Sequence, residues 1–194
     1  MRKFLPVLAV LVFLLSACAG KIPHQVVPDY DKRGVRLVAV LPIVYKGSVK
    51  EIPGFFRARL LDALYFKGYP KIPTAVIDEK LRAAFPDGEA PLKDRASARD
   101  LGNMLGVDAV LYTVIEDCST SFFYLYATTH MAVRLELVSA RTGDTLWSTR
   151  YEATDRIMDI TPDRLKMKSC QVYEPVMDHI VEKVAATIPD GPDL

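Results

Sequence analysis

A cysteine at position 18 carries the thiol whose surroundings point most clearly to a chemical step. It follows an uncharged, largely apolar run over residues 4–17. A transmembrane helix needs about 20 apolar residues, so this run is short for a membrane anchor, and Pro6 also disfavours one. Basic residues, a short apolar core and small residues before a cleavage point are typical of a secretory signal. The sequence therefore predicts a signal over residues 1–17 and a mature chain that begins with the nucleophilic thiol of Cys18.

The four residues Leu15-Ser16-Ala17-Cys18 resemble the lipobox of bacterial lipoproteins. This resemblance implies that the thiol receives a diacylglycerol, that the signal is cut before it, and that the new amine is acylated by a fatty acid such as palmitate. One acyl chain binds a membrane only marginally, whereas several hold a protein there stably. Ala19 stands where an aspartate would indicate retention in the inner membrane. The resemblance implies a lipid anchor in the outer membrane, facing the periplasm, and leaves exposure at the cell surface open.

Two further cysteines, Cys118 and Cys170, remain once Cys18 carries lipid. Compartments outside the cytoplasm permit disulfides. One interpretation is a bridge that closes a loop of about 50 residues and adds roughly 2–4 kcal/mol of stability. The other is two unrelated thiols that lie far apart in the fold, and the sequence leaves both open.

No familiar catalytic or metal-binding pattern occurs among the remaining polar residues. The three histidines, His24, His130 and His179, lack the H-E-x-x-H spacing of a zinc site, and there is no G-x-S-x-G nucleophile elbow. Glu116 and Asp117 are adjacent, and neighbours on a strand point to opposite faces. We therefore predict no enzyme, no cofactor and no metal; only a deep polar pocket that joins Glu116, Asp117 and His130 would favour an enzyme.

An aromatic stretch over residues 121–130 has apolar side chains on both faces of an expected strand. Its aromatic members are Phe122, Phe123, Tyr124 and Tyr126. Aromatic side chains are enriched at the centres of protein interfaces. Either a helix covers this part of the strand, or the stretch is an exposed interaction surface, and both interpretations stay open.

Composition fits one globular domain. The chain has 194 residues, of which 50% are hydrophobic and 25% charged. Removing Arg2 and Lys3 with the signal changes the formal side-chain charge from +1 to −1. Nucleic-acid binding depends on an excess of basic contacts to phosphate, so the sequence predicts no nucleic-acid partner.

Hydrophobic periodicity predicts a single α/β domain over residues 35–189, after a tether over 18–34 and before a tail over 190–194. Fully extended, the tether would reach about 50 Å. Strands are predicted over residues 35–45, 72–77, 108–117, 119–138 and 145–153, and helices over 51–67, 79–85, 94 or 96 to 105, and 175–188. The expected architecture is a mixed sheet flanked by helices, with parallel strands early and an antiparallel meander late.

Several segments together resemble a family of bacterial lipoproteins of uncharacterised function, to which neisserial vaccine candidates belong. They are VRLVAVLP (35–42), FKGYPKIPTAVIDEKL (66–81), GVDAVLYTVIED (106–117) and RLELVSARTGDTLWS (134–148). The resemblance covers residues 35–188 but fails at the 45–54 loop, which lacks the family's Asn/Ser-rich stretch. It implies a fold like that of the TolB N-terminal domain and CsgG-type secretion lipoproteins, with no catalytic residues.

The same resemblance implies a role in envelope assembly, secretion or transport alongside CsgG-like lipoproteins. The sequence therefore predicts a protein-interaction module, which forms a homodimer through a sheet edge or the aromatic strand. The alternative is a regulator that contacts a peptidoglycan synthase or the cell wall itself.

Overall fold

The computed structural model describes residues 21–85, 97–123, 126–158 and 173–192. Within these residues the strands form one mixed sheet in the order β1-β6-β5-β4-β2, with β3 also beside β4. The strands are β1 (His24–Val26), β2 (Val38–Val40), β3 (Val44–Tyr45), β4 (Ala109–Phe123), β5 (Tyr126–Ser139) and β6 (Thr145–Met158). β2 and β3 run parallel to β4, whereas all other pairs are antiparallel. The predicted mixed sheet, parallel early and antiparallel late, is confirmed.

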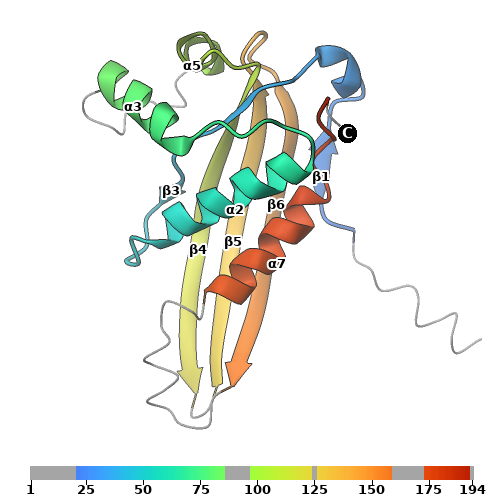
Figure 1. Ribbon diagram of the computed structural model, residues 1–194. Helices are drawn as coiled ribbons and strands as arrows, with labels where there is room; N and C mark the ends of the chain where they lie inside the picture. The colour runs from blue at the N-terminus through green and yellow to red at the C-terminus, as the bar shows by residue number, and fades with distance from the viewer. Residues whose placement is uncertain (1–20, 86–96, 124–125, 159–172, 193–194) are drawn as a thin grey trace, which may run out of the picture.

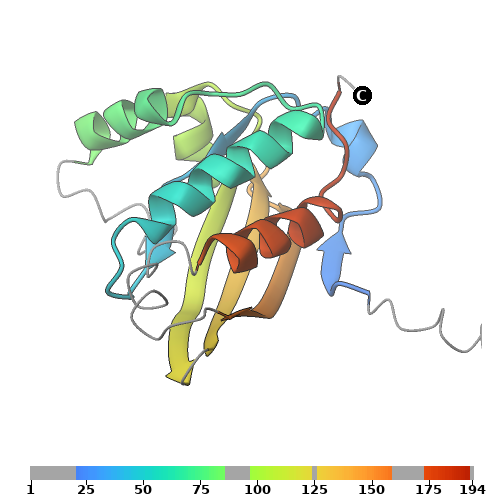
Figure 2. The ribbon, with the colours of Figure 1, turned by 60° about the horizontal axis from the view of Figure 1, so that its bottom comes forward.

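Helices cover both faces of the sheet, but only over part of its length. Helix α2 (Ile52–Phe66) and helix α7 (Glu174–Ala185) lie side by side on one face, as Figures 1 and 2 show. Helix α3 (Thr74–Ala84) and the shorter helix α5 (Ala98–Leu105) pack on the other face, near the end where β6 begins. β4, β5 and β6 extend well beyond these helices at the lower end of Figure 1.

The main core lies between the sheet and the α2–α7 pair. Apolar residues recur at every fourth position of α2, which places one stripe of the helix on the sheet. The stripe consists of Ile52, Phe56, Leu60 and Leu64. From β5, alternate residues Met131, Val133, Leu135 and Leu137 point into the same core. The period-two pattern predicted for this strand is confirmed.

Residues 24–33 form part of the folded domain, although the sequence predicted a tether there. β1 pairs with β6 from His24 opposite Thr149 to Val26 opposite Trp147. A short 3-10 helix, η1 (Tyr30–Arg33), follows, and the Tyr30 hydroxyl lies 2.6 Å from that of Tyr69 in the core. The domain therefore begins at β1, because pairing with β6 and burial of Tyr30 fix this segment. In the predicted tail, Gly191 donates a backbone hydrogen bond to Lys67.

Two of the predicted strands differ from the structure. The first, over 35–45, is divided into β2 and β3, because Pro42 between them has no backbone N–H for the ladder. The second, over 72–77, belongs mostly to α3, which begins at Thr74 directly after Pro73. The β-branched residues of this segment favoured a strand, but burial of Ile77 and Leu81 at helical spacing selects a helix.

The bounds of the meander strands differ from the prediction, with β4 and β6 longer and β5 shorter. The single strand expected over 119–138 contains the β4–β5 hairpin, so that β4 ends at Phe123 and β5 begins at Tyr126. β6 continues to Met158 rather than ending at residue 153. The result is a three-stranded ribbon that projects from the body of the domain.

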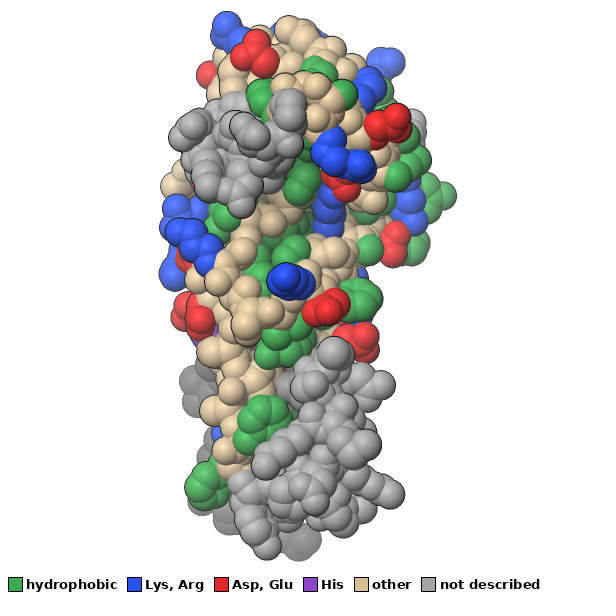
Figure 3. Space-filling view, turned by 90° about the vertical axis from the view of Figure 1, so that its left-hand side faces the viewer, with side chains coloured by type: hydrophobic (Ala, Val, Ile, Leu, Met, Phe, Trp, Pro, Cys, Tyr) green, Lys and Arg blue, Asp and Glu red, His purple; other side chains and the backbone are tan. Residues whose placement is uncertain are grey.

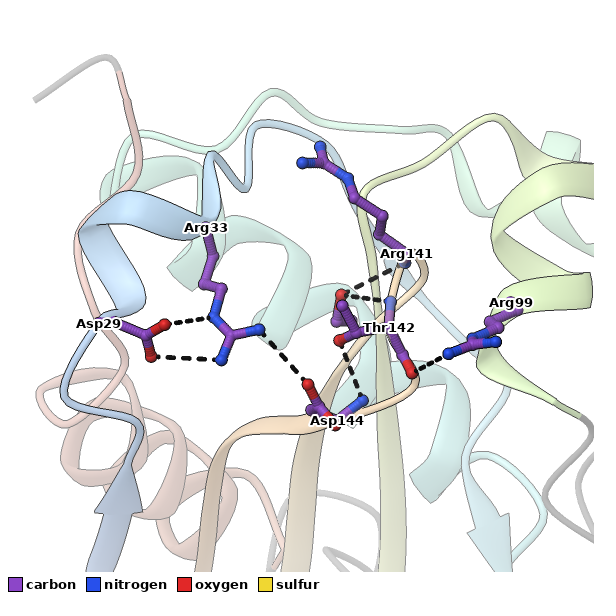
Figure 4. Close-up of polar contacts among 7 residues, drawn as sticks. Asp29, Arg33, Arg99, Arg141, Thr142 and Asp144 are labelled. Carbon is purple, nitrogen blue, oxygen red and sulfur yellow. Dashed lines mark hydrogen bonds and ion pairs between the residues drawn. The ribbon is translucent and has the colours of Figure 1, made fainter.

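The turn between β5 and β6 is fixed by polar contacts to two neighbouring segments (Figure 4). Gly143 has a φ of 80°, which other residues rarely adopt. Arg33 of η1 binds Asp29 and reaches Asp144 of the turn at 3.3 Å. From α5, Arg99 donates to the backbone carbonyl of Thr142 at 2.7 Å. The turn therefore joins the N-terminal segment to the helical layer on the α5 side.

Arg57 links α2, β2 and α3 through a buried guanidinium. Its Nε and Nη2 donate to the carbonyl of Val40 at 3.0 and 2.8 Å, and its Nη1 binds both carboxylate oxygens of Asp78 at 2.7 and 2.9 Å. Arg57 is only 7% exposed. A buried charge is tolerated only when it is paired and hydrogen-bonded, and these contacts satisfy it.

We predict that Arg57→Ala lowers the free energy of unfolding by about 2–3 kcal/mol, at or below the low end of the usual range for a broken buried pair. The reason for the smaller value is that the Asp78 side chain remains 35% exposed. Arg59→Ala on the same helix removes only exposed ion pairs, including one to Asp178, and should cost less than about 1 kcal/mol. Urea unfolding measures both, and equal losses would contradict the assigned role of Arg57.

Candidate functional site

The face of the β4–β6 ribbon opposite α2 and α7 is the candidate site, because below α3 and α5 no helix among the described residues covers it. We call it the open face. The strand register places its side chains in rows across the three strands. One row joins Asp117, Ala132 and Glu152, and the next toward the tip joins Ser119, His130 and Thr154. The open face is therefore mainly polar and accessible.

A charged cluster on the open face is centred on Glu116. Its carboxylate binds Arg134 at 2.5 Å and Arg150 at 2.7 Å. The hydrogen bond from Arg150 is the main cause that lowers the pKa of Glu116, and the charge of Arg134 adds to it. The same contact raises the pKa of Arg150. Both arginines are thus held in fixed positions on an exposed surface.

Glu116 and Asp117 lie on the same face, contrary to the expectation that neighbours point apart. The register shifts between Ile115 and Asp117, which marks a β-bulge. The extra residue lets Glu116 reach the arginines while Asp117 faces His130. A bulge of this kind breaks the strict alternation of a strand, and the sequence pattern gave no sign of it.

Asp117, His130 and Thr154 form a polar line with limited catalytic potential. His130 Nδ1 lies 3.1 Å from the Thr154 hydroxyl, and His130 Nε2 lies 3.7 Å from Asp117. The second distance is too long for a hydrogen bond. The two grooves closest to this line are lined by Arg134 and Glu136 rather than by Glu116, Asp117 or His130.

An open groove of about 430 Å³ lies beside this cluster, where β1 meets β6 and β5. Its lining comes from three strands and is mostly polar. The residues are Pro23, His24, Gln25, Arg134, Glu136, Ser148, Thr149 and Arg150. Among the described residues no group of three or more His, Cys, Asp or Glu side chains has the arrangement of a metal site. The groove has the character of a polar contact surface.

The aromatic stretch lies at the far end of the ribbon and is exposed. Phe122, Phe123 and Tyr126 are 46%, 78% and 36% exposed, and Met158 of β6 joins them at 65%. Figure 3 shows hydrophobic side chains exposed near the lower end of the molecule. Tyr124 lies outside the described residues. Among the described residues, no helix covers these three aromatic side chains.

Cys118 lies on the α7 side of β4 and is half-buried near the N-terminal end of that helix. It forms a hydrogen bond with the Tyr45 hydroxyl, and burial raises the pKa of its thiol to about 11. Cys18 and Cys170 lie outside the described residues. Cys170 is three residues before Tyr173, which also lies near Tyr45, so the pairing of Cys118 with Cys170 stays a proposal.

Sequence reasoning missed the two arginines of the open face, Arg134 and Arg150. The sequence pattern placed Arg134 on the water-facing side of a strand and assigned no role to Arg150. Their alternation with apolar neighbours was visible, but the pairing Arg134 opposite Arg150 depends on the β5–β6 register. No local signal indicates that a single carboxylate, Glu116, joins them.

Comparison with known proteins agrees with this fold. The family model "Putative lipoprotein GNA1162-like" matches residues 35–191. The putative lipoprotein NMB1124/NMB1162 of Neisseria meningitidis serogroup B is 29% identical over 145 residues, or 71% of this chain. That match spans 64% of the relative's own length. The family resemblance stated from the sequence segments is confirmed.

A solved lipoprotein structure is similar in fold, and a second structure matches less closely. The crystal structure of lipoprotein GNA1162 from Neisseria meningitidis has a TM-score of 0.55 and 24% identity, covering 73% of this chain and 97% of that one. A PelC dodecamer from Paraburkholderia phytofirmans has a TM-score of 0.49 and 14% identity, covering 80% and 96%. Among the described residues of this chain, no helix is long and apolar enough to cross a bilayer.

The lowered pKa of Glu116 predicts a pH-dependent contribution to stability. A carboxylate with a depressed folded pKa stabilises the fold above its unfolded pKa, and this contribution is lost as the pH falls through the folded value. Glu116→Gln should therefore be less stable than the native chain at pH 7, by up to about 1 kcal/mol. The difference should shrink below about pH 4.5.

Urea unfolding of both chains between pH 7 and pH 3 measures this difference. Glu79→Gln on the exposed surface of α3 is the control for loss of a carboxylate without the arginine pair. A difference for Glu116→Gln that stays constant over this range would contradict the electrostatic explanation.

The environment of Cys118 predicts two labelling results. Without reductant, the proposed bridge should protect Cys118 and Cys170 from maleimide even in urea. After reduction and refolding, Cys118 should react at least about tenfold more slowly at pH 8 than in urea, because its raised pKa leaves little thiolate. Peptide mass mapping distinguishes the two sites. Labelling of both in urea without reductant would exclude the bridge.

Proposed function

Because the chain belongs to the GNA1162-like family of putative lipoproteins, we propose that it is anchored to the outer membrane through lipid on Cys18. The globular domain then faces the periplasm and acts through contacts with other envelope proteins. The names of its relatives indicate no catalytic activity. We propose a role in envelope assembly, secretion or transport. The match spans only 64% of the relative's length, so we do not assign the activity of that whole protein to this chain.

The observation that carries this proposal is the open face. An antiparallel sheet can leave one face in water, and the exposed side chains of this face are mainly polar, with Arg134 and Arg150 paired to Glu116. Arg134, Arg150 and Glu116 present both signs of charge on a surface of fixed geometry. Charge arrangements of this kind give a protein interface its specificity and register. A CsgG-like lipoprotein with complementary charges is the partner that we propose.

The strand edges offer a second mode of contact, through which a homodimer would form. β1 covers β6 only from residue 147 to 149. Beyond that point, the outer edge of β6 has no neighbouring strand among the described residues. Unpaired edges are templates for addition of another strand. A second copy of the chain paired along this edge would extend the sheet, as the sequence prediction of a homodimer requires.

The lipid anchor is tested by metabolic labelling with an alkyne analogue of palmitate. The native chain should become labelled. The Cys118→Ala variant should also become labelled, because it keeps the thiol at position 18. Cys18→Ala should carry no label, and mass analysis of the native chain should find its N-terminus at residue 18 with diacylglycerol and acyl additions. Label on Cys18→Ala, or a native chain that begins at Met1, would contradict the anchor.

The interaction role is tested by a photoreactive amino acid on each face of the domain. Benzoylphenylalanine in place of the exposed Glu152, on the open face, should yield a discrete adduct in living cells. The same residue in place of Glu182, exposed on α7, should not.

The mass of the partner separates the candidates. A CsgG-like lipoprotein supports the proposal, and the chain itself indicates the homodimer. A peptidoglycan synthase supports the alternative role as a regulator of wall synthesis. If position 152 gives no adduct, or both positions give the same one, the open face is not the interaction surface.

A further inference from the structure

The three ribbon strands end in a row of exposed apolar side chains. The register places Phe123 opposite Tyr126 and Tyr126 opposite Met158, all on the open face. Phe122 lies on the opposite face of the same strand end and is also exposed. We call these four side chains the apolar tip. They lie at the end of the ribbon that is farthest from the helices (Figure 1).

Polarity on the open face changes in steps with distance from the apolar tip. Successive rows are two residues apart, or about 7 Å. The first row above the tip contains Ser121, Thr128 and Arg156, and the next contains Ser119, His130 and Thr154. Among the residues that the structure describes, the first carboxylates on this face, Asp117 and Glu152, are six residues from the tip, about 20 Å along the strands. On the opposite face, Asp155 is nearer, at about 10 Å.

The position of β1 limits how far Cys18 can be from the ribbon along the chain. β1 is antiparallel to β6, and β6 runs toward the tip, so the chain enters β1 from the tip side (Figure 1). Six residues separate Cys18 from His24, which allows at most about 20 Å. From Thr149, the partner of His24, to Met158 is nine residues along β6, or about 30 Å. The part of the ribbon beyond β1 is therefore longer than the reach of residues 18–24, a segment that we call the leader.

We propose that the apolar tip enters the surface of the same lipid bilayer that holds the acyl chains of Cys18. This inference rests on the lipid anchor proposed above. Because the leader is shorter than the distance from β1 to the tip, a domain whose ribbon points along the membrane normal must place the tip at or within the bilayer surface. The sequence prediction of a long tether that lifts the domain away is replaced by a domain held against the membrane at two points.

The chemistry of the tip fits an interfacial position. Tyrosine is enriched at the boundary between lipid headgroups and acyl chains, and phenylalanine is typical of the apolar side of segments that enter this boundary. The Arg156 guanidinium lies one row above the tip, 5.8 Å from the Tyr126 ring centre. With the tip inserted, this is the level at which the phosphates of the lipid headgroups would lie. A long cationic side chain next to an inserted segment reaches back to such phosphates.

Tryptophan fluorescence provides the test. The mature lipidated chain is reconstituted in phosphatidylethanolamine–phosphatidylglycerol vesicles that contain brominated phosphatidylcholine, which quenches nearby tryptophan. Phe123→Trp places a reporter at the tip. Phe66→Trp is the matched control, because Phe66 is 76% exposed at the end of α2, against 78% for Phe123. Native Trp147 is fully buried and supplies the background.

The reporter at position 123 should lose about half of its emission, as expected for a ring inserted about 5–10 Å into the interface, whereas the reporter at position 66 should lose little. Flotation shows whether the chain is anchored. A chain that fails to float overturns both the anchor and the tip insertion. A chain that floats with no quenching at position 123, or with equal quenching at both positions, overturns the insertion alone. A shift of the emission that grows with the number of protein molecules per vesicle, without quenching, would indicate contact with a second copy at the tip. That result would also overturn the proposed insertion.

Discussion

The buried guanidinium of Arg57 is the interaction on which the arrangement of layers depends. Helices α2 and α3 lie on opposite faces of the sheet, and β2 forms the edge between them. Arg57 crosses this edge: it binds the carbonyl of Val40 at the end of β2 and the carboxylate of Asp78 in α3. A charge that is desolvated in this way needs all of these partners together. The position of one helix therefore fixes the other, and both fix the strand between them.

That constraint places the helices at one end of a long sheet. α3 and α5 cover the end where β4 begins, and α2 and α7 cross the opposite face. Beyond them, β4, β5 and β6 continue as a ribbon that is stabilised by its hydrogen-bond ladder and by cross-strand pairs. One such pair is the hydroxyl contact of Thr120 and Thr129, at 3.1 Å. The ribbon thus carries accessible side chains on a scaffold that does not need another layer to stay extended.

The sequence predicted the features that arise from local periodicity. The stripe of α2, the alternation of β5 and the glycine of the β5–β6 turn were all visible, because each depends on neighbours in sequence. The misassigned features depend on contacts between distant residues. β1 has only three residues, each exposed, and becomes a strand through its pairing with β6. The segment before residue 78 has β-branched residues, yet it becomes α3 because Ile77 packs on the sheet.

The candidate site was less predictable than the fold for the same reason. The aromatic residues 122, 123 and 126 were identified from composition, but whether they were covered could not be decided without the helices. Glu116 and Asp117 were recognised as adjacent carboxylates, but they were predicted to point to opposite faces of the strand. The β-bulge that places them on the same face leaves no clear mark in the sequence. Its link to Arg134 and Arg150 is a property of strand register, which one-dimensional patterns specify only indirectly.

The change in polarity along the ribbon cannot be attributed to core packing. The open face of the ribbon contacts no helix among the described residues, so the choice between charged, hydroxyl and apolar side chains there is free of the volume constraints that govern a core. Water alone would favour polar residues along the whole length, and exposed strand ends that are apolar promote aggregation. The rows nevertheless change from ion pairs at Glu116 to an apolar row at Phe123. An environment that changes from aqueous to apolar over about 20 Å accounts for this order, and the boundary of a bilayer is such an environment.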